Sequence, residues 1–392
     1  MFRRNRNQGR HINSDNLLAE IDRLKASPLG SIFAELHKGL VCTQAAYSAG
    51  GCSQLQMESF LNQAHAVAQL MPKNFTDRFD FDAQMIGTLQ TSWNGSKQRL
   101  SQLIIPVSGD TWAHQGTFLP VKPVNSTQGK VASINVIYIP GDGELGSIDL
   151  LHYPFLCHEL AHNLYFFDDL FFRQQFDKKL GDFISKLRLR SISDHGAAKK
   201  ASENMRSEIE AFWRPTPHHQ NWAHEIAMDL TALWTCGPAY LAALLDELDG
   251  QHLDPYFIGQ EHPPYAVRVE ALIFACRQLG WMREADELGK HIRQWQQSAH
   301  YKQVSNRYVA LTDTSLTADC VRCALETCRH HNLPKCDQQT IARVRQKLNR
   351  NETPDWGTEL ILAAWLKYEM NNTNYDAWQQ SVIRELLDSL KP

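Results

Sequence analysis

The sequence has no uninterrupted apolar run long enough to cross a membrane. Its longest apolar stretch, residues 226–245, is broken by Asp229 and by Gly237-Pro238, a pattern typical of a buried helix, a break and a second helix. No apolar segment follows the basic residues of positions 1–16, so we expect no secretory signal there. These absences predict a soluble protein without a membrane partner.

An excess of charge of one sign is also missing. The 392 residues carry a formal net charge of -3, which argues against a general polyanion binder, so no nucleic-acid partner is expected. The nine cysteines are spread from Cys42 to Cys336 without the density of a small disulfide scaffold. This usage suits a reducing compartment and predicts a cytoplasmic protein.

Two common enzyme motifs are absent, the Gly-x-Ser-x-Gly elbow and the Walker phosphate loop. The hexapeptide GDGELG, residues 141–146, formally fits G-x-G-x-x-G after a predicted strand. However, Asp142 and Glu144 would put negative charge where a pyrophosphate binds, and no second parallel strand is predicted after it. We therefore interpret these glycines as a turn rather than a dinucleotide site.

The hydrophobic pattern divides the chain into three regions. Residues 1–100 show helical spacing, residues 101–299 begin with short strand-like segments before the helical pattern returns, and residues 300–392 look like an added helical module. The segments LIIPVSGDTW, GTFLPVKPV and ASINVIYIP are rich in β-branched or aromatic residues and predict a small sheet. The expected fold class is α+β, predominantly helical.

The segment FLCHELAHNL, residues 155–164, gives the strongest indication of chemistry. In a helix His158 and His162 lie one above the other, so they can present two imidazole nitrogens to one ion. Glu159 lies one step round the helix, where its carboxylate can take a proton from an activated water. Pro154 suits the first position of such a helix. The pattern predicts a metal site, and the alternative is a pair of hydrogen-bonded core histidines.

A catalytic zinc needs a third protein ligand and an open position. Asp168 has the spacing of one possible ligand, but Tyr165 stands where that arrangement needs a glycine. Glu225 is the stronger candidate, and Asp229 follows it on the same face of a predicted helix. Asp229 could then accept the second ring N–H of a ligating histidine. The alternative is that one of these two acids caps a helix or pairs with a base.

Three segments together resemble the gluzincin zinc peptidases: HELAH, the later Glu-x-x-x-Asp pattern, and EHPPYAVRVEAL. The similarity is to the CAAX-prenyl-protease type and its soluble mini-gluzincin relatives, and it covers residues 130–275. It implies a zincin-like core in residues 101–299, with a small sheet packed on the active-site helix. It also implies Zn²⁺ held by His158, His162 and Glu225, with Glu159 as general base and Asp229 behind the ligands.

The same resemblance places His262 and Arg268 near the open position, where they would stabilise a developing oxyanion. The alternatives are an ordinary helix-entry turn at His262-Pro-Pro and an ion pair between Arg268 and an acid. The segment INVIYIPGDG resembles the edge strand of these enzymes, which could pair with an extended peptide. The spanning helices of the membrane-embedded members are missing here, so lipidated substrates do not carry over.

The resemblance implies a soluble zinc metallopeptidase, most simply a metalloendopeptidase, that acts on a peptide or protein substrate. Two other functions stay open: a non-catalytic or autoinhibited zinc-binding regulatory protein, and a zinc hydrolase of a non-peptide amide.

Other possible metal ligands give weaker indications. His218 and His219 are adjacent and point apart. A zinc knuckle is conceivable around one cysteine-rich segment, although the same residues also fit the core of an amphipathic helix. Its candidate ligands are Cys320, Cys323, Cys328, His330, His331 and Cys336.

Overall fold

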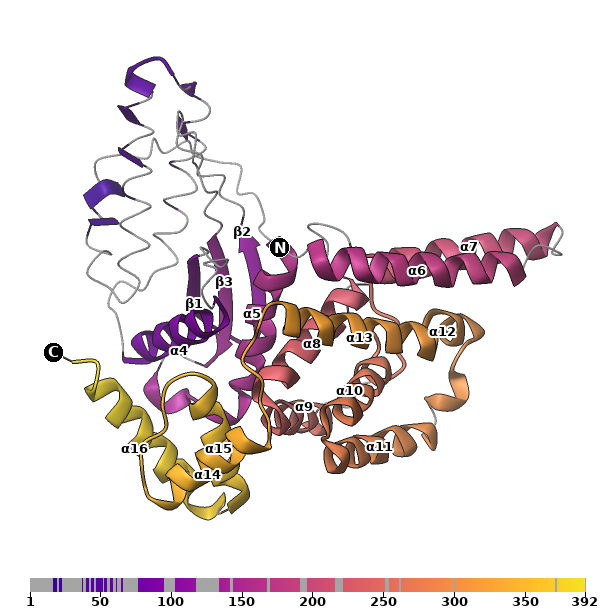
Figure 1. Ribbon diagram of the computed structural model, residues 1–392. Coiled ribbons are helices and arrows are strands. Elements are labelled where there is room, and N and C mark those ends of the chain that lie inside the picture. The colour runs from indigo at the N-terminus through magenta and orange to yellow at the C-terminus, as the bar shows by residue number, and fades with distance from the viewer. Residues whose placement is uncertain are drawn as a thin grey trace. The chain divides into compact units, whose positions relative to one another are not determined.

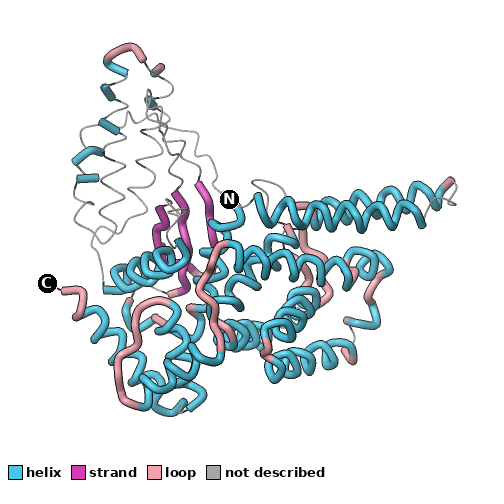
Figure 2. Tube along the Cα trace, in the orientation of Figure 1, coloured by secondary structure: helices cyan, strands magenta, loops and turns pink. Residues whose placement is uncertain are grey.

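The computed structural model describes part of the 392-residue chain. These residues are 77–94, 103–117, 134–141, 144–167, 170–190, 196–215, 221–250, 254–260, 262–298, 300–370 and 372–391, with scattered positions before residue 66. They are predominantly helical with one small sheet, as predicted (Figures 1 and 2). None of the helices in this part of the chain combines the length and apolarity that a bilayer crossing requires.

The chain forms two compact units, residues 1–84 with 101–147 and residues 85–100 with 148–392. This division does not follow the three regions expected from the sequence, whose boundaries stay predictions. The helix α4, Asp77–Asn94, begins in the first unit and ends in the second.

The first unit contains a three-stranded sheet of β1 (Leu103–Gly109), β2 (Ala113–Thr117) and β3 (Ile134–Pro140) in the order β1-β3-β2. The strand β3 pairs parallel with β1 and antiparallel with β2. Leu103 lies opposite Ile134 in the first pairing and Ala113 opposite Tyr138 in the second. The prediction of a small sheet is confirmed.

The prediction that residues 134–140 form an edge strand is wrong. The backbone of β3 is paired on both sides, so it is the middle strand of the sheet. Consecutive side chains of a strand point to opposite faces, and Val136 and Ile137 are both buried, with exposed fractions of 3% and 0%. Burial on both faces is typical of a central strand.

The chain bends at Gly141, directly after β3, whereas residues 142 and 143 lie outside the described part of the chain, so the interpretation of GDGELG as a turn stays a prediction. Gly141 has φ +132, and its N–H donates to the Gly109 carbonyl at 3.1 Å. A Cβ atom there would lie 2.6 Å from Ser147 Oγ, so the position requires glycine. Arg78 of α4 fixes this bend by donating to Ser147 Oγ at 3.0 Å and to the Pro140 carbonyl at 3.3 Å.

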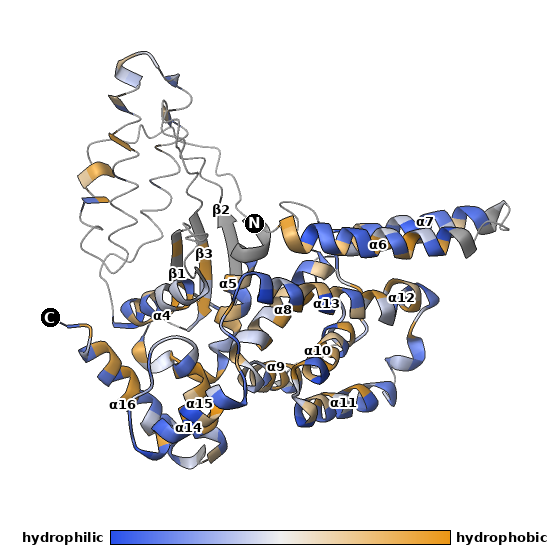
Figure 3. Cartoon of the chain, viewed as in Figure 1, coloured by the Kyte–Doolittle hydropathy of each residue, from blue (hydrophilic) through white to orange (hydrophobic). Residues whose placement is uncertain are grey.

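The second unit is helical. Figure 1 shows α6 and α7 side by side, and hydrophobic residues alternate with hydrophilic ones around α11 (Figure 3). The helices are α5 (Pro154–Phe167), α6 (Leu170–Arg190), α7 (Ala197–Trp213), α8 (Trp222–Cys236), α9 (Pro238–Gly250), α10 (Tyr265–Leu279), α11 (Met282–Gln296), α12 (Asn306–Leu311), α13 (Thr314–His330), α14 (Gln338–Asn349), α15 (Thr358–Met370) and α16 (Tyr375–Asp388).

Helix α8 lies at the centre of this unit. All of its residues are buried, and it contacts α5, α9, α10, α13 and α15. It begins where the Asn221 side chain accepts a hydrogen bond from the His224 N–H at 3.1 Å, and it ends at Gly237 with φ +54. Pro238 then starts α9. The predicted helix, break and second helix over residues 226–245 are confirmed.

Helix α5 carries the HELAH segment and begins at Pro154, as predicted. Leu156 and Leu160 are buried, with exposed fractions of 0% and 1%. The contact between α5 and α8 brings the two segments of the expected site together. Asp168, the alternative third ligand, lies outside the described residues.

Candidate metal centre

Side chains from α5 and α8 face one another where the two helices pack. The imidazole rings of His158 and His162 lie 5.3 Å apart between centroids, at 75° to one another. From α8, Glu225 Oε2 lies 3.6 Å from His158 Nε2, and Glu225 Oε1 lies 3.9 Å from His162 Nε2. The Glu225 carboxylate therefore faces both imidazoles across the contact of the two helices.

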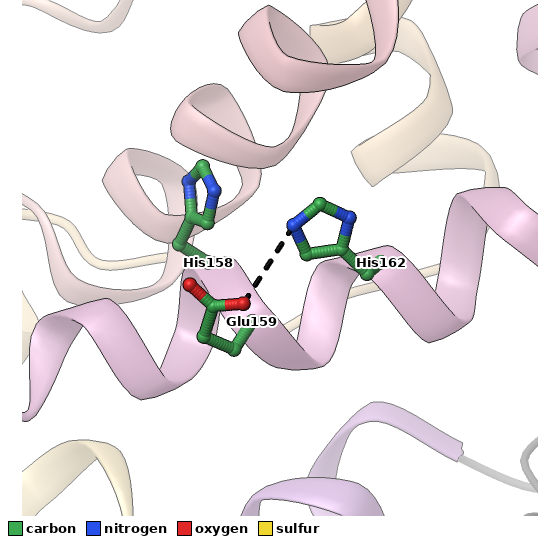
Figure 4. A group of neighbouring side chains, drawn as sticks. All are labelled: His158, Glu159 and His162. Carbon is green, nitrogen blue, oxygen red and sulfur yellow. Dashed lines mark ion pairs between the residues drawn. The ribbon is translucent and has the colours of Figure 1, made fainter. Parts of the chain in front are cut away.

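Glu159 completes the cluster on α5. Its Oε2 lies 3.7 Å from His162 Nε2, the contact marked by the dashed line in Figure 4. One ligand atom from each of His158, Glu159 and His162 lies within 4.8 Å of the others. This buried His-Glu-His cluster can hold a metal ion.

Burial and hydrogen bonding fit such an ion. Glu225 has an exposed fraction of 0%, and neither of its carboxylate oxygens has an aligned hydrogen-bond donor among the described residues. A buried carboxylate is costly unless it is paired, and the groups that face this one are the imidazoles of His158, His162 and His262. Two imidazole nitrogens and a carboxylate are common metal ligands in proteins. The residues that are present therefore fit a metal ion.

Asp229 lies behind His158, one helical turn after Glu225. Its Oδ1 is 2.9 Å from His158 Nδ1, the ring nitrogen on the side away from Glu225. The contact holds the imidazole in the orientation that leaves Nε2 toward the cluster. Asp229 is therefore placed at ion-pair distance behind His158, while the ligand role of His158 itself stays a prediction.

Arg268 of α10 pairs with Asp229. Its Nε donates to Oδ2 at 2.8 Å and its Nη2 donates to Oδ1 at 2.7 Å. Both side chains are buried. This geometry matches the alternative considered for Arg268, an ion pair with an acid, and an oxyanion contact for it stays a prediction without support from these hydrogen bonds.

His262 lies at the exposed side of the cluster. Its Nδ1 is 3.0 Å from Glu225 Oε2, and 61% of its side chain is exposed. The preceding loop is tied to α8, because Trp222 Nε1 donates to the Gly259 carbonyl at 3.1 Å. Pro264 occupies the N-cap position of α10, so the helix-entry role of this segment is present together with the contact of His262 with Glu225. A catalytic role for His262 stays a prediction.

Electrostatics in the cluster follow from burial and these contacts. Burial raises the pKa of Glu159 to about 7. Burial alone would raise the pKa of Glu225, but contacts with His158 and His262 hold it well below its usual range. Burial alone would lower the pKa of His158, but its contacts with Asp229 and Glu225 raise it to about 10.

Tyr240 is a member of the site that the sequence reasoning missed. Its hydroxyl, on α9, donates to Asp229 Oδ1 at 2.5 Å. No spacing pattern marks this tyrosine, because its approach to Asp229 depends on the turn at Gly237 rather than on a shared helix face.

The cysteine-rich segment lies in α13 and the loop after it. Cys320, Cys323, Cys328 and Cys336 are all buried free thiols, with exposed fractions of 0–2%. Within the described ranges, no cluster of metal-ligating atoms forms around them. They match the alternative interpretation as small core residues, whereas His218 and His219 lie outside the described residues.

Comparison of the chain with protein-family models, with curated proteins and with solved structures finds no match.

Proposed function

We propose that this protein is a zinc metallopeptidase with a zincin-like core, which hydrolyses peptide bonds in a peptide or protein substrate. The observation that supports the proposal is the convergence of His158, His162 and Glu225, with Glu159 beside them. The first three would hold Zn²⁺. Glu159 would be the general base.

Bound zinc would supply a Lewis acid that polarises a carbonyl and makes water more acidic. Glu159 would take the proton of the attacking water and pass it to the leaving amine. Burial raises the pKa of its carboxyl to about 7, which suits a group that gains and loses a proton near neutral pH. Asp229 would hold His158 in place during the reaction, because it contacts the imidazole nitrogen opposite the site.

His262 would act at the exposed side of the site. It is the member of the cluster with the most exposed side chain, at 61%. Its contact with Glu225 raises its pKa, although burial opposes the shift. A protonated imidazole here would donate a hydrogen bond to the oxyanion that develops on the substrate. We propose this role for His262 and not for Arg268, whose described hydrogen bonds go to Asp229.

A second function is favoured by one observation. The side chains of His158, Glu159 and His162 are exposed by only 3–9%, and a metal held that deeply also suits a latent or regulatory site. In that case the protein would bind zinc with the same residues and would not cleave peptides until another event opened the site.

Metal content and proteolysis of the purified full-length chain test both functions. We expect one zinc per chain in the wild type, no zinc in His162→Ala, and one zinc in the control His300→Ala, whose side chain is 53% exposed. The probe for proteolysis is casein labelled with self-quenching fluorophores. We expect Glu159→Gln to abolish its cleavage while the zinc remains.

The control for Glu159→Gln is Glu326→Gln, an exposed glutamate of α13 that should leave cleavage unchanged. Full cleavage by Glu159→Gln would refute the assignment of the base. Zinc bound as expected, without cleavage of casein or of a random peptide library by the wild type, would favour the latent site. A wild type that contains no metal would show that His158 and His162 are ordinary core residues.

A further inference from the structure

Tyr240 reaches the candidate metal centre through the turn between α8 and α9. Gly237 at this turn has φ +54, and Pro238 begins α9 directly after it. A Cβ atom on Gly237 would lie 2.6 Å from Cys336 Sγ, so only glycine fits both the dihedral angle and the space. Helix α9 contacts α8, and Tyr240, with an exposed fraction of 0%, faces Asp229.

One carboxylate oxygen of Asp229 contacts side chains from three other helices. Oδ1 lies 2.5 Å from the Tyr240 hydroxyl of α9, 2.7 Å from Arg268 Nη2 of α10 and 2.9 Å from His158 Nδ1 of α5. The Tyr240 contact is the shortest of the three. The Asp229 carboxylate is therefore held by Arg268 and by Tyr240 at the place where it lies 2.9 Å from His158 Nδ1.

The donor and acceptor roles in this group are fixed. Burial and the negative charge of Asp229 raise the pKa of the Tyr240 hydroxyl well above 10, so it keeps its proton. The hydroxyl donates and the carboxylate accepts.

The Tyr240 ring also packs on α5. Its centroid lies 5.9 Å from that of Phe155 at 78°, an edge-to-face contact one helical turn before His158. A change to phenylalanine keeps the ring and this contact and removes only the hydroxyl. The effect of the hydroxyl can therefore be measured without a cavity in the core.

We propose that Tyr240 is a positioning residue of the metal centre, which sets the affinity for zinc by holding Asp229 against His158. The inference rests on the metal site of the proposed function and not on its peptidase activity. Loss of the hydroxyl frees one side of the Asp229 carboxylate, so His158 is less well oriented before the metal binds. Groups that orient a metal-ligating histidine typically change metal affinity by about 10–100-fold when they are removed.

The test compares the zinc dissociation constants of the full-length wild type, Tyr240→Phe and Tyr375→Phe, measured by competition with a chromophoric chelator. Tyr375 is the matched control, because it is also buried and its hydroxyl donates to Gln379 Oε1 at 2.9 Å, within α16. We expect zinc binding about 10-fold weaker in Tyr240→Phe and unchanged in Tyr375→Phe. The absorption spectrum of bound Co²⁺ should shift in Tyr240→Phe alone.

A purely structural tyrosine would behave differently. Unfolding of the metal-free protein in urea would then become easier in Tyr240→Phe, while the zinc affinity and the Co²⁺ spectrum stayed as in the wild type. That result would overturn the inference and leave the proposed function standing. A wild type that binds no zinc would overturn both, whereas zinc binding without peptide cleavage would overturn only the peptidase.

Discussion

Arg268 and Asp229 form a two-point ion pair in the interior of the helical unit. Arg268 Nε lies 2.8 Å from Asp229 Oδ2, and Nη2 lies 2.7 Å from Oδ1. The side chains are 10% and 1% exposed. Two parallel hydrogen bonds satisfy the flat guanidinium and the carboxylate together, which a lysine could not do.

We predict that Arg268→Met destabilises the protein by about 3 kcal/mol or more, because it leaves the Asp229 charge buried without its main partner. The measurement is the free energy of unfolding in urea, with a chelator present to remove metal. The control is Arg345→Met on the exposed side of α14, which should change it by less than about 0.5 kcal/mol. A loss below about 1 kcal/mol in Arg268→Met would show that the ion pair contributes little.

The sequence predicted which of these side chains share a helix face. The spacing of His158 and His162 places both rings on one face of a helix whatever the rest of the fold does. Glu225 and Asp229 have the same spacing, and the structure places both toward α5. The helix, break and second helix over residues 226–245 could also be predicted, because Gly237-Pro238 interrupts the apolar run.

The non-local part could not be predicted in this way. The strand β3 is central because β1 and β2 pair with its two sides, and no pattern within residues 134–140 specifies which strands will do so. The contact of Tyr240 with Asp229 depends on a positive φ at Gly237 and on the packing of Cys336 against it. Arg268 had two possible partners in the sequence, and only the fold shows that its hydrogen bonds go to Asp229.

Gly237 gives a second stability prediction. An alanine there would adopt an unfavourable φ of +54 and place its Cβ 2.6 Å from Cys336 Sγ. We expect Gly237→Ala to lower the free energy of unfolding by about 2–4 kcal/mol, from strain and overpacking together. Gly237→Ala with Cys336→Ala should recover part of the loss, because the sulfur contact disappears while the strain remains.

Gly181 in α6 is the control for this change. A Cβ atom there would meet no heavy atom within 4 Å, and alanine favours a helix over glycine. Gly181→Ala should therefore raise the free energy of unfolding by about 0.5–1 kcal/mol. Equal losses from Gly181→Ala and Gly237→Ala would contradict the role of the turn.

The contact of His152 with two carboxylates predicts a dependence of stability on pH. Its Nδ1 lies 2.7 Å from Asp149 Oδ2 and its Nε2 lies 3.0 Å from Asp246 Oδ2. The hydrogen bond to Asp149 raises the pKa of His152 above its usual 6.5, and burial opposes the shift only in part. Burial alone would raise the pKa of Asp149, but the hydrogen bond and charge of His152 lower it.

The direction of the pH dependence of stability follows from these two pKa shifts. The raised pKa of His152 contributes stability that is complete below pH 6.5 and is lost as the pH rises through that raised pKa. The lowered pKa of Asp149 contributes stability that is present above its usual 3.8 and is lost at lower pH. The contact therefore stabilises the protein most between these two ordinary values.

We predict that the wild type exceeds His152→Gln in free energy of unfolding at pH 6 and that this difference shrinks by pH 9. The effect should be below about 1 kcal/mol, because the aspartates are largely exposed and water screens the charges. Urea denaturation of both proteins at the two pH values, with the same zinc concentration, measures the difference. A difference that grows toward pH 9 would show that the shift of His152 has the opposite sign.

The buried cysteines of α13 predict the number of metal ions per chain. Burial raises the pKa of the Cys323 thiol to about 11 and that of Cys336 to about 12, whereas zinc binds the deprotonated thiolate. Three of the four thiols lie in one continuous helix, which spreads them along its length instead of around one ion. We therefore expect Cys323→Ala to retain the zinc content of the wild type, measured by mass spectrometry of the metal in the purified protein.

The matched change at the other candidate site, His162→Ala, should remove the zinc, because it takes away one of the two imidazoles that face Glu225. Two zinc ions in the wild type and one in Cys323→Ala would instead mean that the thiols form a second site, and that this part of α13 rearranges when it binds metal.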